Sequence, residues 1–510
     1  MSASPARLAW PGAVFLAWLL AWSHLSAEWS ADEQYRYGFG VPFLAAWMAW
    51  RRFAGPMSPA PPKLIWICGL AVALAMLILG EALRRHDPLW RFTGALLTAG
   101  AMALSVAWLH RRGGGALVRR QLFPLLFAAT AVPWPVPVEV WTIHHLAAVV
   151  TDVATSLANL LGIAALQHGN TIELAKGVVG VDDACSGIQS LQATLMASLF
   201  LGEFFALRAA GRIALTLAGA AVSFFTNCGR VLTLTLLAHS RGAEAALEWH
   251  DLVGGSATGV TFGLLLAAAA LLSRGRAALP AAPSSFAPAR MPEGIAVFAT
   301  VLAIPLAAHF WFSHFENAGP LSGKPSAWVL SDSHLPSGWT AEFVAPTRTV
   351  SAGLRFSEWQ SFRVRSAAGL AAQVIRLAWK PGTRLPSFVS NHTPAVCMPA
   401  AGWIQSAPPD TLTLDVRGTV LQGVIYPFTR EGARLLVFQS LCAGGRNELR
   451  FVDPTLIPGG FQRLAALWQA PLRQISEELL IYLPDPGDAD ARKSAATAIL
   501  DAVLGQEHGR

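Results

Sequence analysis

The sequence is poor in charged residues and in cysteine. Only 14% of its 510 residues are charged, whereas a soluble protein carries about 25%, so a wholly soluble protein is excluded. Five cysteines at irregular spacing form no disulfide framework and no zinc or haem pattern, and we expect neither a metal nor another cofactor. The net charge of +7 comes from Arg clusters between apolar segments, which gives no reason to expect nucleic acid as a partner.

What the chain has in abundance is apolar sequence, which makes up 53% of its residues. The apolar runs are concentrated before about residue 315, and their lengths fit a lipid bilayer as the partner. They predict a polytopic α-helical membrane protein of about 8–10 transmembrane helices with a C-terminal soluble α+β domain. The first run lacks a convincing cleavage site and is interpreted as a retained span. We expect spans at about residues 8–26, 36–53, 64–83, 89–109, 121–140, 187–207, 212–238, 252–273 and 293–313.

The Arg clusters predict which membrane face each span end occupies, because cytoplasmic ends carry an excess of Lys and Arg. One transmembrane topology places all but one of the Arg clusters in the cytoplasm. The cytoplasmic clusters are Arg51-Arg52, Arg111-Arg112, Arg119-Arg120, Arg208 with Arg212, and Arg274 with Arg276. Only Arg84-Arg85 falls on the wrong side. In this topology three parts of the chain lie outside: the loop 141–186, the end of span 252–273 next to His250, and the chain after residue 313.

We divide the chain into a transmembrane domain at 8–275, a linker with the last span at 276–319, and an α+β domain at 320–510. In the outward loop, residues 142–166 repeat apolar positions at helical spacing, and two strand-like runs around Lys176-Gly177 predict a hairpin. In the last domain we expect strands at 360–365, 371–379, 411–417, 420–428 and 433–441, and helices near 461–470 and 488–504.

Cys185 stands where the outward loop enters the span 187–207. We expect it in or just before the first turn of a helix, where unpaired amides and the positive end of the dipole favour a thiolate. Asp183 or Ser186 would cap that helix. The alternative is that Cys185 is a small buried apolar residue, the usual fate of a cysteine in a membrane helix.

Arg230 lies inside the span 212–238, and Asn227 shares its helical face. An ionised side chain there costs about 2.5–3.5 kcal/mol, so it needs a partner or a wet cavity. Two polar residues on one stripe predict a pocket, although Arg230 alone would also fit a residue that snorkels to headgroups.

His250 immediately precedes the next span, on the same predicted face as Cys185 and Arg230. A Cys–His pair supplies a nucleophile and a base, and a fixed cation can hold a developing oxyanion. Asp251 or Asp183 would orient the imidazole, and the sequence does not choose between them. His144 and His145 on the outer loop are rival bases.

The remaining cysteines divide between the two parts of the chain. Cys397 and Cys442 lie in the C-terminal domain, where a disulfide between them and a free thiol at each position both remain open in an oxidising compartment. Cys68 and Cys228 lie in apolar spans, and we expect them to be inert.

Three stretches resemble the signature blocks of the exosortase/archaeosortase family over about residues 8–275. They are Ala184-Cys185-Ser186-Gly187-Ile188-Gln189-Ser190-Leu191, Asn227-Cys228-Gly229-Arg230 and His250. Many members of that family have Arg where this chain has Gln189. The tail, from His392 to Trp403 around Cys397, resembles the exopolysaccharide-operon protein that accompanies exosortases and is sometimes fused to them.

The resemblance implies a cysteine peptidase or transpeptidase of the Gram-negative inner membrane, linked to protein sorting, exopolysaccharide and biofilm. Its partners would be membrane-anchored proteins with a C-terminal signal made of a Pro-Glu-Pro motif, a span and a basic tail. By the same resemblance Cys185 is the nucleophile, Arg230 stabilises charge and His250 is the base or acid. The active site and the C-terminal domain would be periplasmic.

A second hypothesis is a non-enzymatic membrane component of a polysaccharide export or assembly system, with the tail as an interaction module. It predicts that Cys185, Arg230 and His250 are replaceable, whereas deletion of 320–510 abolishes function. A transporter is a weaker third hypothesis, because the sequence shows no clear inverted repeat. The sequence leaves open whether water or an amine accepts the acyl group.

Overall fold

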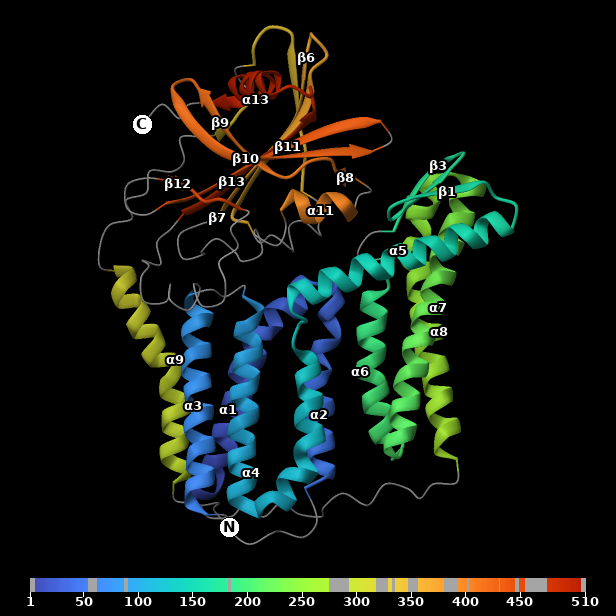
Figure 1. Ribbon diagram of the computed structural model, residues 1–510. Helices are drawn as coiled ribbons and strands as arrows, with labels where there is room; N and C mark the ends of the chain where they lie inside the picture. The colour runs from blue at the N-terminus through green and yellow to red at the C-terminus, as the bar shows by residue number, and fades with distance from the viewer. Residues whose placement is uncertain are drawn as a thin grey trace. The chain divides into compact units, whose positions relative to one another are not determined.

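The computed structural model shows two compact units, Met1–Glu81 with Arg91–Ala307 and Ala82–Trp90 with Ala308–Arg510. The first is helical apart from a small sheet, and the second is built around a large sheet (Figure 1). The structure describes residues 5–53, 62–86, 90–181, 185–274, 293–317, 329–332, 335–346, 356–379, 393–400, 403–430, 432–444, 449–454 and 475–505.

Long apolar helices make up most of the N-terminal part of the chain. Within the described residues, six helical segments are long and apolar enough to cross a membrane, which confirms a polytopic helical membrane protein. The α-helices are α1 (Pro5–Ala31), α2 (Val41–Arg51), α3 (Lys63–His86), α4 (Arg91–Ala128), α5 (Val136–Leu160), α6 (Ile188–Phe204), α7 (Ala209–Arg241), α8 (Ala243–Ser273) and α9 (Gly294–Asn317). The six segments are α1, α3, α4 with the following 3-10 turn, α7, α8 and α9.

Three of the nine expected spans differ from the sequence prediction. The segments expected at 36–53 and 187–207 contain α2 and α6, which have only 11 and 17 residues. The segment expected at 121–140 is divided between the last part of α4, the 3-10 helix η2 (Ala129–Ala131) and the start of α5. Gly113 and Gly114 leave helical geometry inside α4, and Gly114 has a φ of 65°, which glycine tolerates. Pro133 and Pro135 prevent a continuous helix from η2 into α5.

The helices α6, α7 and α8 lie side by side (Figure 1). Small and hydroxyl-bearing side chains hold them together, as is usual in membranes. The hydroxyl groups of Ser190 and Ser223 are 3.0 Å apart, and those of Thr226 and Thr261 are 2.7 Å apart. At Gly219 an added Cβ would lie 2.7 Å from the hydroxyl oxygen of Ser198, so α6 and α7 approach closely.

The outward loop folds as a helix followed by a small sheet. The helix α5 begins at Val136, six residues before the expected start, and ends at Leu160. The predicted hairpin is confirmed as β2 (Thr171–Leu174) and β3 (Gly177–Gly180). A further strand, β1 (Ala165–His168), pairs with β2 and was not predicted.

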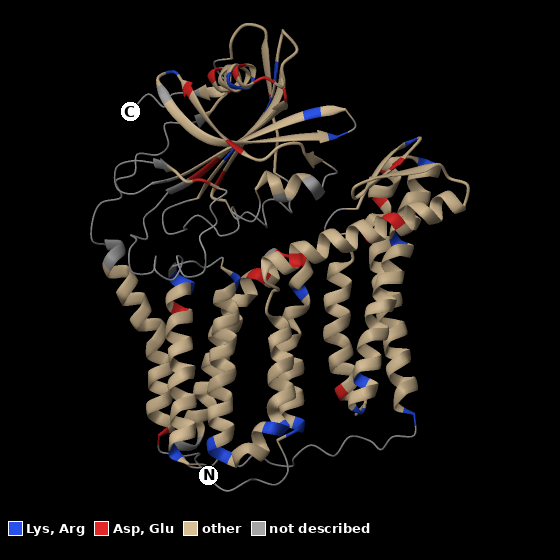
Figure 2. Cartoon of the chain, viewed as in Figure 1, with Lys and Arg blue, Asp and Glu red and all other residues tan. Residues whose placement is uncertain are grey.

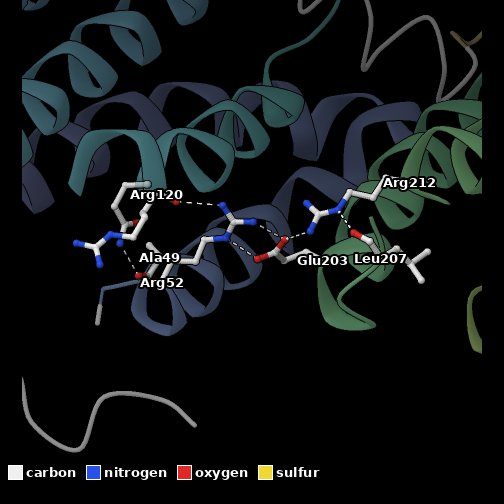
Figure 3. A network of polar contacts seen from close by, with 7 residues as sticks. Ala49, Arg52, Arg120, Glu203, Leu207 and Arg212 are labelled. Carbon is white, nitrogen blue, oxygen red and sulfur yellow. Dashed lines mark hydrogen bonds and ion pairs between the residues drawn. The ribbon is translucent and has the colours of Figure 1, made fainter. Parts of the chain in front are cut away.

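At the end of α6 remote from Ile188, charged side chains form a network around the buried carboxylate of Glu203 (Figure 3). Arg52 donates to the two carboxylate oxygens of Glu203 at 2.5 and 2.7 Å, and Arg212 lies 2.7 Å from the same carboxylate. Arg52 also donates to the carbonyl oxygen of Arg120 at 3.0 Å. Lys and Arg gather at this end of the first unit's helices (Figure 2). The network and the residues before Ile188 are therefore separated by the length of α6, about 25 Å.

The second unit is an antiparallel sheet of order β5-β6-β7-β13-β11-β10-β8, with β12 paired to β11 and β9 to β10. Its strands are β5 (Trp339–Phe343), β6 (Glu358–Ser366), β7 (Ala371–Trp379), β8 (Ile404–Gln405), β9 (Asp410–Val416), β10 (Thr419–Arg430), β11 (Ala433–Gly444), β12 (Leu449–Phe451) and β13 (Ile475–Pro484). The short strands β4 (Val329–Leu330) and β14 (Leu504–Gly505) pair separately.

Among the residues that the structure describes, two helices accompany this sheet, α11 (Pro394–Ala400) and α13 (Ala489–Val503). Apolar residues of α13 pack with β7, β11 and β13 in the core of the unit, so the predicted α+β domain is confirmed. All five predicted strands are found, in β6, β7, β9, β10 and β11, and the predicted helix at 488–504 is α13. The helix predicted near 461–470 lies outside the described residues.

Candidate active site

Cys185 lies between the small sheet and α6, in a mostly apolar environment. The hairpin closes where the amide of Val181 donates to the carbonyl oxygen of Asn170 at 2.8 Å. Cys185 is 4% exposed and belongs to a cluster that includes Ile172 of β2 and Val179 of β3. The thiol therefore lies in the same apolar cluster as the small sheet. Asp183, which the sequence suggested as a cap or an orienting group, lies outside the described residues.

A glycine turn sets the position of Cys185 relative to α7. Gly187 is the N-cap of α6 and has a φ of 88°, a left-handed conformation that favours glycine. The side-chain amide of Asn227 donates to the carbonyl oxygen of Cys185 at 2.9 Å, and a Cβ on Gly187 would lie 2.7 Å from that amide nitrogen. The N-cap is thus Gly187 and not Ser186. The hydroxyl oxygen of Ser186 nevertheless accepts from the amide of Ile188, the first residue of α6, at 3.3 Å.

The structure brings Cys185, Arg230 and His250 together. Sγ of Cys185 lies 3.1 Å from Nε2 of His250, which is in the second turn of α8. Nη2 of Arg230, on α7, lies 3.0 Å from the same Nε2. On the other side of the ring, Nδ1 lies 3.0 Å from a carboxylate oxygen of Asp251. Three segments that are distant in sequence therefore meet at one imidazole.

The helix α8 passes close to the guanidinium group. At Gly254, one turn after His250, an added Cβ would lie 3.0 Å from Cζ and from Nη2 of Arg230. At the adjacent Gly255 an added Cβ would meet nothing within 4 Å. Sequence reasoning missed Gly254, and the available signal was a glycine four residues after the histidine, on the same helical face.

The other candidate residues lie in different surroundings. Nδ1 of His145 is 2.7 Å from the carbonyl oxygen of Trp141 in its own helix, and the ring stacks on that indole at 4.2 Å. No disulfide joins Cys397 and Cys442 in this structure, and burial raises the pKa of the Cys442 thiol. Cys228 is buried in α7, whereas Cys68 is exposed on α3.

The arrangement of these groups suits nucleophilic chemistry. A thiol within hydrogen-bond distance of an imidazole nitrogen can transfer its proton and act as a nucleophile. A guanidinium group at the same nitrogen has only donors, so it can bind an oxyanion that forms beside the thiol. Among the described residues, no group of three or more His, Cys, Asp and Glu side chains is placed to hold a metal ion.

The fold and the site together define a polytopic membrane protein with a Cys–His pair and an arginine at one end of its helices. Residues 29–267 match the family model for the transmembrane exosortases, and this segment contains all three side chains. At the level of the family, the match supports a membrane transpeptidase that is related to protein sorting. No curated protein and no solved structure matches the chain.

Proposed function

We propose that this protein is a membrane cysteine transpeptidase or protease that cleaves C-terminal sorting signals. The observation that carries the proposal is the distance of 3.1 Å between Sγ of Cys185 and Nε2 of His250, with Arg230 at the same nitrogen. The match over residues 29–267 supports it at family level. In this proposal Cys185 is the nucleophile, His250 the base and then the acid, and Arg230 the group that binds the oxyanion.

The reaction proceeds through a thioester. The thiol proton of Cys185 passes to Nε2 of His250 while sulfur bonds to the carbonyl carbon of the scissile peptide, and the displaced π electrons form an oxyanion beside Arg230. Collapse of this intermediate breaks the C–N bond, and the leaving amine takes the proton from His250. An amine or a water molecule then attacks the thioester, loses a proton to His250 and releases the thiol.

The substrate class follows from the family resemblance and from the position of the thiol at the end of α6. A protein with a Pro-Glu-Pro motif, a membrane span and a basic tail would present its scissile bond at the bilayer surface. Confinement of enzyme and substrate to one membrane favours their encounter and orientation. The site would face the periplasm, because it lies at the opposite end of α6 from the Arg52–Glu203–Arg212 network, and basic ends are cytoplasmic.

The test is processing of a membrane-anchored reporter that carries such a signal and an N-terminal epitope, co-expressed with the full chain. The wild-type protein should yield a shortened product, and Cys185→Ala at equal protein level should leave only the precursor. Cys68→Ala is the matched control, because it also removes a thiol but lies on the exposed side of α3. It should process normally.

The same reporter separates the enzyme from a non-enzymatic export component. Full processing by Cys185→Ala, or an unprocessed reporter with the wild-type protein, would reject the proposed reaction. A purely structural component would keep its function when Cys185, Arg230 and His250 are each replaced and would lose it when 320–510 are deleted.

A further inference from the structure

One nitrogen of His250 has two neighbours that compete for it. Nε2 is 3.1 Å from Sγ of Cys185 and 3.0 Å from Nη2 of Arg230. An imidazole nitrogen carries either one hydrogen or one lone pair. It therefore cannot donate to sulfur and accept from the guanidinium group at the same time.

The guanidinium group decides which form the ring takes. Arginine remains protonated and offers only donors, so the Nε2 atom that it faces must present its lone pair. The ring hydrogen then lies on Nδ1, where the carboxylate of Asp251 accepts it at 3.0 Å. Protonation of Nε2 would set two N–H groups against each other, and a charged ring would also be repelled by the arginine. The geometry thus fits a neutral imidazole beside a thiol that keeps its hydrogen.

We propose that Arg230 holds the resting site in this inactive neutral form, and that a substrate carbonyl releases it. This inference rests on the proposed function. The carbonyl oxygen of a bound substrate accepts from the guanidinium group and draws it away from Nε2. The freed lone pair then accepts the thiol proton as sulfur bonds to carbon and the carbonyl oxygen becomes negative. Nucleophile formation is thereby coupled to the presence of a substrate. Unoccupied protein would carry a thiol that reacts slowly with other electrophiles.

Gly254 is the positioning residue of this device. A Cβ added at Gly254 would lie only 3.0 Å from Cζ and Nη2 of Arg230. The guanidinium group therefore packs closely against α8 at this residue, one turn from His250. Alanine at this position would force the guanidinium group to shift by a few tenths of an ångström. The helix would otherwise tolerate alanine, which is a better helix former than glycine. Gly254→Ala should therefore loosen the contact between Arg230 and His250.

The test is the rate at which iodoacetamide alkylates Cys185 at pH 7 in the detergent-solubilised full chain without substrate, followed by mass spectrometry of the Cys185 peptide. A neutral thiol is only a few per cent thiolate at this pH. Arg230→Met, which removes the donors, should let an imidazolium–thiolate pair form and accelerate alkylation by about 3-fold to 30-fold. Gly254→Ala should accelerate it by about twofold or more, and Gly255→Ala should leave it unchanged. Alkylation of Cys397 in the same samples is the internal reference.

Whether Arg230→Met speeds or slows the alkylation of Cys185 decides between this inference and the usual effect of a cation on a neighbouring thiol. A cation beside a thiol normally favours the thiolate, so its removal would slow alkylation. An unchanged or slower rate in Arg230→Met would overturn the inference, as would equal rates in Gly254→Ala and Gly255→Ala if Arg230→Met fails to fold. Neither result affects the proposed function, which depends on reporter processing by the wild type and by Cys185→Ala.

Discussion

The turn at Gly187 allows a sharp test of how the thiol is positioned. Alanine at this position would destabilise the fold in two separate ways, through backbone strain and through a steric clash. A φ of 88° is unfavourable for an L-residue by about 1–2 kcal/mol. In addition, the new Cβ would lie 2.7 Å from the amide nitrogen of Asn227, which would displace the donor that holds the carbonyl group of Cys185. Loss of that hydrogen bond costs about 1 kcal/mol, but a shift of a catalytic group by about 1 Å can lower the rate about 100-fold.

A matched variant separates the two costs. Gly162 has a φ of 83°, and an added Cβ would meet nothing within 4 Å. Gly162→Ala therefore has the same backbone cost without the clash. We expect both variants to lower the thermal unfolding midpoint. Only Gly187→Ala should also lower reporter processing per folded molecule, by about 10-fold to 100-fold. Equal processing by the two variants would refute the idea that the Asn227 contact positions Cys185.

Three further predictions concern charged groups. Glu203→Gln should destabilise the protein by about 1.5–3 kcal/mol, because two half-buried arginines would lose their charged acceptor. Glu33→Gln, in the exposed ion pair with Arg36, should cost at most about 1 kcal/mol; thermal unfolding in detergent compares them. Burial raises the pKa of Glu478 to about 7, so between its unfolded pKa and pH 7 the folded domain holds a proton that the unfolded chain releases. Its stability should fall as pH rises from about 4 to 7, and Glu478→Gln should flatten this dependence, as read from hydrogen exchange in β13. Asp251→Ala should lower processing by less than about tenfold, since this fully exposed carboxylate only orients His250; a complete loss would show a larger role.

The long apolar helices were predictable because a membrane requires long uninterrupted apolar runs. α3, α7 and α9 are found close to the expected positions, whereas α8 begins at Ala243, before the expected start at 252, and therefore includes His250. The short α2 and α6 were overestimated, because composition alone does not show where a helix ends. The central strand β13 was missed because Glu477 and Glu478 interrupt its apolar pattern, and both carboxylates are buried in the structure.

The candidate site was predictable only as a set of residue types on one face. The motif around Cys185 and the polar stripe of α7 indicated which side chains to consider. Their convergence on Nε2 of His250 depends on side-chain rotamers and on the close approach of α7 and α8. The roles of Gly187 and Gly254 depend on distances to Asn227 and Arg230 that no sequence spacing encodes.

The most direct measurement is a search for a covalent thioester between Cys185 and the processed reporter. After brief co-expression and acid quenching, mass spectrometry of the full chain should find the reporter's new C-terminus attached to the Cys185 peptide. Hydroxylamine should release this adduct, and Cys185→Ala should lack both the adduct and the product. Processed reporter from Cys185→Ala, or an adduct at any other cysteine, would contradict the assignment of Cys185 as the nucleophile.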